Sequence, residues 1–172
     1  MTVTIKWIVT VIFCEKGDVD MIVFKEVTED NFHEVIGLKV GEAQAKFVAP
    51  NVKSLAECWL YREDDDVFPY AVYNEHEEMV GFLLLDLDKE KREYLIWRMM
   101  VDEKFQGRGY GRQIVEHVIE MAKANDGYDI LIADYVVGNE AMKKLLGALG
   151  FEETGFEEDV DEVVMTLDVK DF

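Results

Sequence analysis

Three glycines in the segment "QGRGYG", residues 106–111, most constrain this chain's fold, because they join a strand-like stretch to an amphipathic helix. The preceding residues 93–101 read as an apolar strand. The helix after the glycines carries apolar residues at helical spacing on one face, namely Ile114, Val118, Met121 and Ala122. Backbone N–H groups at a helix start are unpaired and carry partial positive charge from the helix dipole. The glycines would let an anion approach those groups closely, so the segment predicts an anion site that fits a pyrophosphate.

Two nucleotide-binding motifs with similar glycines do not match this loop. A P-loop ends in Gly-Lys-Ser/Thr, whereas Gly111 is followed by Arg112 and Gln113. A dinucleotide fingerprint, G-x-G-x-x-G, fails because Arg112 stands where the third glycine is needed. What remains is Q-x-x-G-x-G directly after a strand, and a glycine-rich turn without a ligand is the alternative.

The rest of the chain reads as a mixed α/β domain over residues 21–172. Strands are expected over residues 21–27, 67–73, 79–87, 93–101, 129–137 and 161–169, and helices over 28–40, from Ser54, after the glycines and over 139–149. The segment "SLAE" reads as a capping box, in which Ser54 and Glu57 satisfy the first backbone donors of the second helix. Antiparallel hairpins followed by β-α-β-α-β imply a mixed sheet with helices on both faces. Residues 1–20 form either an extension or an extra strand at "WIVTVIFC", which is too short for a membrane span and lacks the cleavage site of a signal peptide.

Composition limits the partners. The chain has 172 residues, of which 49% are hydrophobic, so it is expected to form one domain with an ample core. A net charge of −19 disfavours nucleic acid and anionic membranes and suits cationic small molecules, with the alternative that the acidity only keeps the protein soluble. Neither the two cysteines nor the three histidines have metal-ligand spacing, so we expect reduced thiols, a cytoplasmic protein and no metal site.

The chain resembles the GNAT superfamily of acyl-CoA-dependent N-acetyltransferases. Its signature, Q/R-x-x-G-x-G/A, is met by Gln106, Gly109 and Gly111. "GNEAMKKLLGALGFEETG" resembles the family's Asn-led helix followed by Gly-Phe, and "DEVVMTLDV" resembles its closing strand. The resemblance runs over residues 21–169, and it is strongest to the bacterial spermine/spermidine acetyltransferase branch.

This resemblance implies a mostly antiparallel central sheet whose splayed parallel strand pair holds acetyl-CoA as co-substrate. The implied cofactor-binding residues are Met99, Met100 and Val101 for the pantetheine arm, Gln106, Gly107, Arg108, Gly109, Tyr110, Gly111 and Arg112 for the pyrophosphate, and Asn139 near the thioester. A local cationic band agrees with a polyanionic ligand, although its first two members are expected to be ordinary solvated residues: Lys91, Arg92, Arg98, Lys104, Arg108 and Arg112.

The match to the family breaks at both proton-transfer positions. The family's usual strand glutamate falls on Leu95, and Glu93 shares its sheet face only if no bulge intervenes. The tyrosine that protonates the leaving thiolate in many relatives is here Leu146, which cannot donate a proton. Glu93 and Tyr135 are therefore the candidate catalytic residues, with core packing as the alternative for Tyr135.

The first two helices and their connection are expected to wall the acceptor site. The candidate substrate-binding residues are Glu42, Gln44, Trp59, Tyr61 and Trp97, and the acidic segment 156–162 is expected to border the site. We expect transfer of an acetyl group to a primary amine of a small molecule, with a polyamine among the candidate acceptors. The alternatives are acetylation of a protein N-terminus or lysine, and a non-catalytic acyl-CoA-binding domain. A homodimer is among the possible assemblies.

Overall fold

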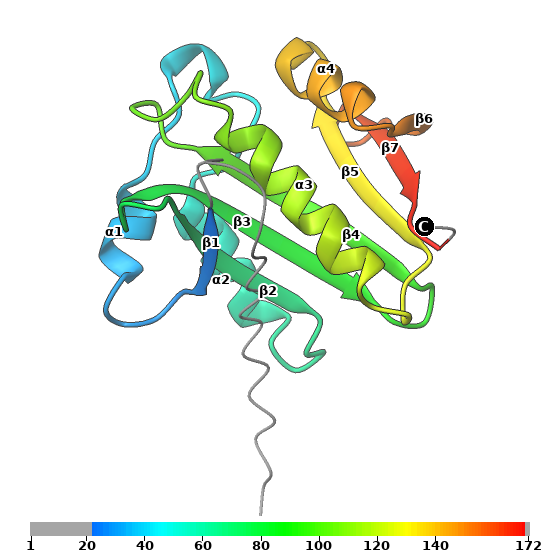
Figure 1. Cartoon of the computed structure of the whole chain (residues 1–172), viewed down its shortest axis with the longest axis horizontal. Coiled ribbons are helices and arrows are strands. Elements are labelled where there is room, and N and C mark those ends of the chain that lie inside the picture. The colour runs from blue at the N-terminus through cyan, green and yellow to red at the C-terminus, as the bar shows by residue number, and fades with distance from the viewer. Residues whose placement is uncertain (1–21, 171–172) are drawn as a thin grey trace, which may run out of the picture.

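The computed structural model describes residues 22–170 (Figure 1), so the strand expected at residues 7–14 lies outside the described part. In chain order the elements are β1 (Val23–Glu26), α1 (Phe32–Gly37), a short 3-10 helix (Glu42–Gln44), α2 (Asn51–Leu60), β2 (Val67–Tyr73), β3 (Met79–Asp88), β4 (Glu93–Val101), α3 (Tyr110–Lys123), β5 (Ile130–Val136), α4 (Glu140–Ala148), β6 (Glu152–Glu157) and β7 (Glu162–Asp168). The predicted mixed α/β class is confirmed.

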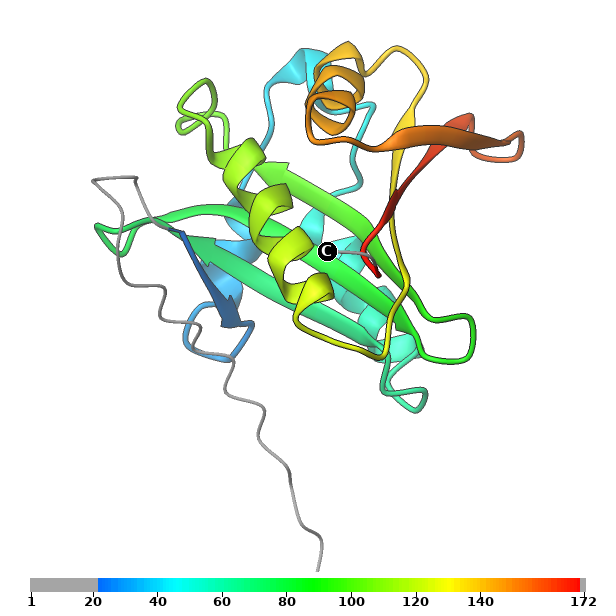
Figure 2. The same ribbon diagram turned by 45° about the vertical axis from the view of Figure 1, so that its right-hand side comes forward.

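One seven-stranded sheet runs through the molecule in the order β1-β2-β3-β4-β5-β7-β6. Only β4 and β5 pair in parallel, and every other neighbouring pair is antiparallel. The crossover between the parallel strands is α3, which lies across one face of the sheet (Figures 1 and 2). Because parallel neighbours run in the same direction, the carboxyl ends of β4 and β5 lie on the same side of the sheet, where α3 begins.

Each face of the sheet has its own apolar core. Residues of α3 such as Ile114 and Val118 are fully buried against one face, together with Leu146 of α4. Val35 of α1 belongs to a second cluster on the opposite face, where α2 also packs. Helices therefore cover both faces, as the sequence predicts.

Three sequence-based expectations about elements need correction. The first helix is shorter than residues 28–40, and the acidic strand β6 was not predicted. The second helix begins at Asn51, with Pro50 at its N-cap, so the capping box at Ser54 is wrong. Ser54 lies a full turn inside the helix, and its fully buried side chain faces the sheet. Within residues 22–170, no helix is long and apolar enough to cross a membrane.

Candidate active site

The parallel pair of strands is joined at one end and open at the other. β4 pairs with β5 only from Glu93 to Ile96, opposite residues 130–133, although both strands continue further. Figures 1 and 2 both show β5 diverging from β4 beyond that point. The gap between the two carboxyl-terminal halves is where an open α/β sheet offers a ligand crevice.

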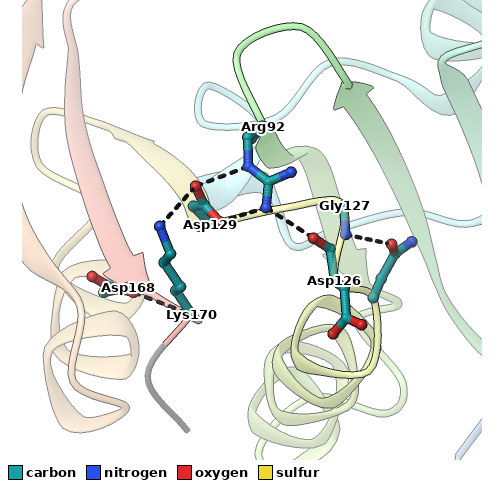
Figure 3. A network of polar contacts seen from close by, with 7 residues as sticks. Arg92, Asp126, Gly127, Asp129, Asp168 and Lys170 are labelled. Atoms are coloured by element: carbon teal, nitrogen blue, oxygen red, sulfur yellow. Dashed lines mark hydrogen bonds and ion pairs between the residues drawn. The ribbon is translucent and has the colours of Figure 1, made fainter.

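A polar network holds the joined end (Figure 3). The Arg92 guanidinium donates to both carboxylate oxygens of Asp129, at 2.9 and 2.7 Å, and to the Asp126 carbonyl at 2.8 Å. Lys170 lies 3.6 Å from the same carboxylate. Hydrogen bonding to Arg92 lowers the pKa of Asp129 to about 2. This network ties the turn before β4 to the loop before β5, so that the strands separate only at their other ends.

A β-bulge at Trp97 coincides with the start of the separation. The pairing of β4 with β3 jumps from Leu85–Ile96 to Leu84–Arg98, which leaves Trp97 as an extra residue. Arg98 then reaches α2, where it forms an ion pair with Glu57 and contacts the Ser54 hydroxyl. The bulge therefore turns the second half of β4 away from β5.

Beyond the bulge, β4 presents an open backbone edge to the gap. The Asp102 amide donates to Val80 of β3 at 2.9 Å, and Met100 pairs with Phe82 on that same side. Hydrogen-bonding direction alternates along a strand. The amides of Met99 and Val101 therefore point into the gap, whereas the amide of Met100 points to β3.

The glycine loop leaves an open backbone surface at the start of α3. Gly107 and Gly109 have φ angles of 75° and 89°, a region that side chains disfavour. A Cβ atom built at either position would meet no atom within 4 Å. Gly109 is the N-cap of α3, and no side chain caps the helix there. Exposed amides at an uncapped helix start fit a phosphate or pyrophosphate.

Two polar side chains fix this loop in place. Asp102 is 4% exposed, and its carboxylate accepts hydrogen bonds from the amides of Lys39 and Lys104, at 3.0 and 3.1 Å. The Gln106 side-chain amide donates to the Val101 carbonyl at 2.9 Å and to Gln44 at 2.7 Å. Gln106 thus connects the loop to the segment between the first two helices.

The expected cationic band divides among three places. Lys91 pairs with Asp88, and Arg92 belongs to the network at the joined end of the strands, so both are exposed but ion-paired residues away from the glycine loop. Arg98 points to α2, so its inclusion in the band is wrong. Lys104, Arg108 and Arg112 remain beside the glycine loop, where the two arginines are exposed.

A cavity of about 760 Å³ joins the gap to the loop. This volume is in the range of small-molecule sites. The glycine-loop wall includes Gln106, Gly107, Gly109, Tyr110 and Gly111, the β4 wall runs from Ile96 to Val101, the β5 wall comprises Asp134, Tyr135 and Val136, and further lining comes from Gln44 to Pro50, Lys53, Asn139, Ala141, Met142, Leu145, Val160 and Glu162.

The expected catalytic residues lie in different places. Tyr135 is 6% exposed and lines the cavity. Glu93 pairs with Ile130 at the joined end of the strands and is not among the lining residues. Leu146 is fully buried in the core, whereas Met142 and Leu145 of the same helix line the cavity.

Only some of the residues expected to bind the acceptor substrate lie at the cavity. Gln44 and Trp97 line the cavity, whereas Glu42, Trp59 and Tyr61 are exposed and do not. Tyr61 contacts the Trp97 ring, with 5.9 Å between ring centroids. The connection between the first two helices does wall the cavity, and Val160 and Glu162 bring the acidic segment to its border. Asn139 caps α4 by accepting from the Met142 amide at 3.2 Å.

One carboxylate in the cavity wall, Asp134, was not predicted, whereas Glu162 belongs to the acidic segment 156–162 that was expected to border the site. Asp134 of β5 and Glu162 of β7 both line the cavity, and burial raises the pKa of each. A single acidic residue within the apolar strand "ILIADYV" is the only sequence signal for Asp134. Its position beside a gap depends on the separation of the strands, which no local pattern encodes.

Comparisons with known proteins agree with this geometry. The profile of the acetyltransferase (GNAT) family matches residues 28–151. The spermine/spermidine N(1)-acetyltransferase of Bacillus subtilis (strain 168) is 27% identical over 60% of this chain and 72% of its own length. Spermidine N-acetyltransferase from Vibrio cholerae, in complex with CoA and spermine, matches with a TM-score of 0.72 at 12% identity, over 86% of this chain and 95% of that one. RimL, a ribosomal L7/L12 alpha-N-protein acetyltransferase in complex with coenzyme A, also matches with a TM-score of 0.72. Its identity to this chain is 14%, and the match covers 87% of this chain and 95% of RimL. At these identities the structural likeness shows the fold.

Proposed function

Because the chain belongs to the GNAT acetyltransferase family, it is an acetyl-CoA-dependent N-acetyltransferase, and we propose that its acceptor is a primary amine of a small cationic molecule, a polyamine in particular. The co-substrate supplies the acetyl group as a thioester. The residues around the cavity bind both substrates and transfer the protons.

The open backbone surfaces fit acetyl-CoA. The amides of Met99 and Val101 on the free edge of β4 suit the pantetheine arm, because an extended chain can pair with a strand edge. The uncapped amides over residues 107–111 suit the pyrophosphate, and Arg108 adds exposed positive charge nearby, whereas Arg112 is ion-paired with Glu116. The thioester would then lie in the gap between β4 and β5.

The observation that carries the choice of acceptor is the pair of carboxylates in the cavity wall. Asp134 and Glu162 line the cavity, and burial raises the pKa of both, to which the charge of the exposed Glu157 adds. Trp97 also lines this cavity, and its ring already carries the Arg98 guanidinium at 4.8 Å from its centroid, which shows that it attracts cations. A net charge of −19 adds long-range attraction for a polycation.

Protonation of the departing sulfur needs a group other than Leu146. The phenols that line the cavity are Tyr110 and Tyr135. The Tyr110 hydroxyl lies 3.4 Å from the Asn74 side-chain amide. Tyr135, which lies where the strands separate, is therefore the better candidate for proton donation, and Tyr135→Phe tests it through the rate of CoA release.

An acceptor panel tests the proposed function. We would measure CoA release with spermidine, with a neutral-bodied primary amine and with a peptide that has a free N-terminus. The proposal expects the highest kcat/KM for spermidine. A preference for the peptide would favour the alternative that the chain acetylates a protein. RimL, which shares the fold, is an acetyltransferase of that kind.

A pair of charge variants then locates the acceptor site. Glu162→Gln removes a carboxylate from the cavity wall, and Glu42→Gln removes one from an exposed position outside it. We expect Glu162→Gln to raise the KM for spermidine more than Glu42→Gln does. The reverse order would favour the placement of the acceptor beside Glu42 that the sequence suggested.

A further inference from the structure

Asp134 and Tyr135 are neighbours on β5, and their side chains project to opposite faces of the sheet. Leu131, Ala133 and Tyr135 belong to the core beneath α3 and α4. Side chains alternate along a strand, so Asp134 faces the other side. Glu162 likewise alternates with the core residues of β7 and shares the face of Asp134. The gap between the strands therefore has the glycine loop and Tyr135 toward one face and two carboxylates toward the other.

One oxygen of Asp134 has no partner. Its Oδ1 atom is buried and accepts no hydrogen bond from any residue between 22 and 170. Buried polar atoms in folded proteins nearly always have a hydrogen-bond partner, so an orphaned carboxylate oxygen in a cavity wall requires an explanation. Rotation of the carboxylate would turn this oxygen toward the cavity that Asp134 lines, where a bound ammonium group would supply the missing donor.

The charges around Asp134 keep it basic. Burial raises its pKa to about 6, and the negative charges of Glu162 and then Glu157 add to that effect. The cation on β4, Arg98, is already paired with Glu57 of α2, and its charge lowers the pKa of Glu162. The remaining charged residues that line the cavity are Lys46 and Lys53, from the connection before α2 and from α2 itself.

We propose that Asp134 is the proton acceptor of the reaction and that its Oδ1 atom removes the proton that an acceptor ammonium must lose before attack. The inference rests on the proposed function, because it requires a primary amine in this cavity. Glu162 and Glu157 contribute by attracting the cation and by keeping Asp134 basic.

The step balances without an oxidant, a reductant or a metal. An N–H bond of the ammonium breaks and an O–H bond forms on Asp134, which frees the nitrogen lone pair. The lone pair attacks the thioester carbonyl carbon, the C–S bond breaks, and the departing sulfur receives the phenol proton of Tyr135, which the second proton of the nitrogen then replaces. Asp134 then returns its proton to solvent, so the products are the acetylated amine, CoA and one proton.

The first test replaces the carboxylate by an amide of the same shape. Asp134→Asn should lower kcat by about 10²- to 10⁴-fold, the usual contribution of a general base. Acetyl-CoA affinity, measured by calorimetry, should be retained, and the melting temperature should not fall. A variant that binds acetyl-CoA, stays folded and keeps the wild-type kcat would overturn the proposal.

The pH profile provides a readout that a merely structural role would not change. If Asp134 takes the proton from a bound ammonium, kcat/KM should rise with pH and level off above the pKa of Asp134, about 6. If the enzyme instead binds neutral amine from solution, kcat/KM should keep rising toward the pKa of a free amine, about 10. The second profile would contradict the proposal.

Two further variants sharpen this comparison. Glu162→Gln should move the inflection to lower pH, because it removes a negative charge that raises the pKa of Asp134. Asp86→Asn is the matched control: Asp86 lies on β3 outside the cavity, and burial together with Asp66 and Asp88 raises its pKa as well. This control should keep both kcat and the inflection, and an inflection that moves with Asp86 instead would refute the assignment.

The same measurements separate this inference from the proposed function. If spermidine proves not to be a substrate, the pH profile is measured with whichever primary amine the panel identifies. Loss of the inflection in Asp134→Asn with that amine supports the proton acceptor and refutes only the polyamine. An inflection that survives the substitution refutes the proton acceptor, whatever the amine.

Discussion

Replacing Asp134 with Asn should stabilise the folded protein at neutral and alkaline pH. The folded state holds a desolvated carboxylate whose pKa is raised from an ordinary value of 3.8 to about 6. A folded pKa above the unfolded pKa means that the folded state binds the proton more tightly. The free energy of unfolding therefore falls as pH rises between these two values, and above about 6 the full cost is present.

The size of this cost follows from the pKa. One pKa unit corresponds to about 1.4 kcal/mol, so the raised pKa sets a ceiling of about 3 kcal/mol at neutral pH. The side chain is only partly buried, and solvent screening reduces the effect to about 1 kcal/mol. The neutral amide does not pay this cost, so the less active variant should be the more stable one.

Urea unfolding of both proteins at about pH 5 and about pH 8 measures the effect. The gain in the free energy of unfolding of Asp134→Asn should be about 1 kcal/mol at the higher pH and smaller at the lower pH. Comparing the two pH values cancels any constant difference between amide and carboxyl packing. A gain that is independent of pH, or a variant less stable than wild type at the higher pH, would refute the reasoning.

Three other predictions concern the loop, the acceptor and α2. Gly109→Val should abolish acetyl-CoA binding in calorimetry, whereas Gly150→Val, at a similar φ of 90° but outside the cavity, should cost stability and keep binding. The KM for spermidine should rise more steeply with salt than that for a neutral-bodied amine, because about 1 M salt shortens the screening length to about 3 Å; equal responses would contradict a polycationic acceptor. Arg98→Met should destabilise the fold by about 1 kcal/mol in urea unfolding, because Glu57 then keeps only its ion pair with the exposed Lys53, and Arg98→Met/Glu57→Met should recover part of that loss; no recovery in the double variant would contradict this account of the pair.

The sequence is informative where apolar periodicity is local. The strands at Val67–Tyr73 and Glu93–Val101 were predicted with their observed bounds, because their composition differs sharply from the turns around them. β6 was missed because all six of its residues are exposed, so it shows no alternation. The capping box at Ser54 failed because Pro50 starts the helix one turn earlier.

The site was predictable only where a contiguous motif carries it. The glycine loop was recognised from the spacing of its glycines in the sequence. The structure leaves the backbone of this loop open, as an anion site requires. Glu93 was tied to the site by counting along the strand. The bulge at Trp97 lies beyond Leu95, so Glu93 does share the face of Leu95, but its place at the joined end of the strands separates it from the cavity. Asp134 gains its chemistry from strand separation and from carboxylates on other strands, which are contacts between residues distant in sequence.

Mass spectrometry of spermidine incubated with acetyl-CoA and the protein tests the central claim most directly. The account predicts acetylated spermidine from the wild type, a much slower yield from Asp134→Asn, and an undiminished yield from Asp86→Asn. Acetylation of a peptide N-terminus but of no small amine, by a protein that binds acetyl-CoA, would contradict it.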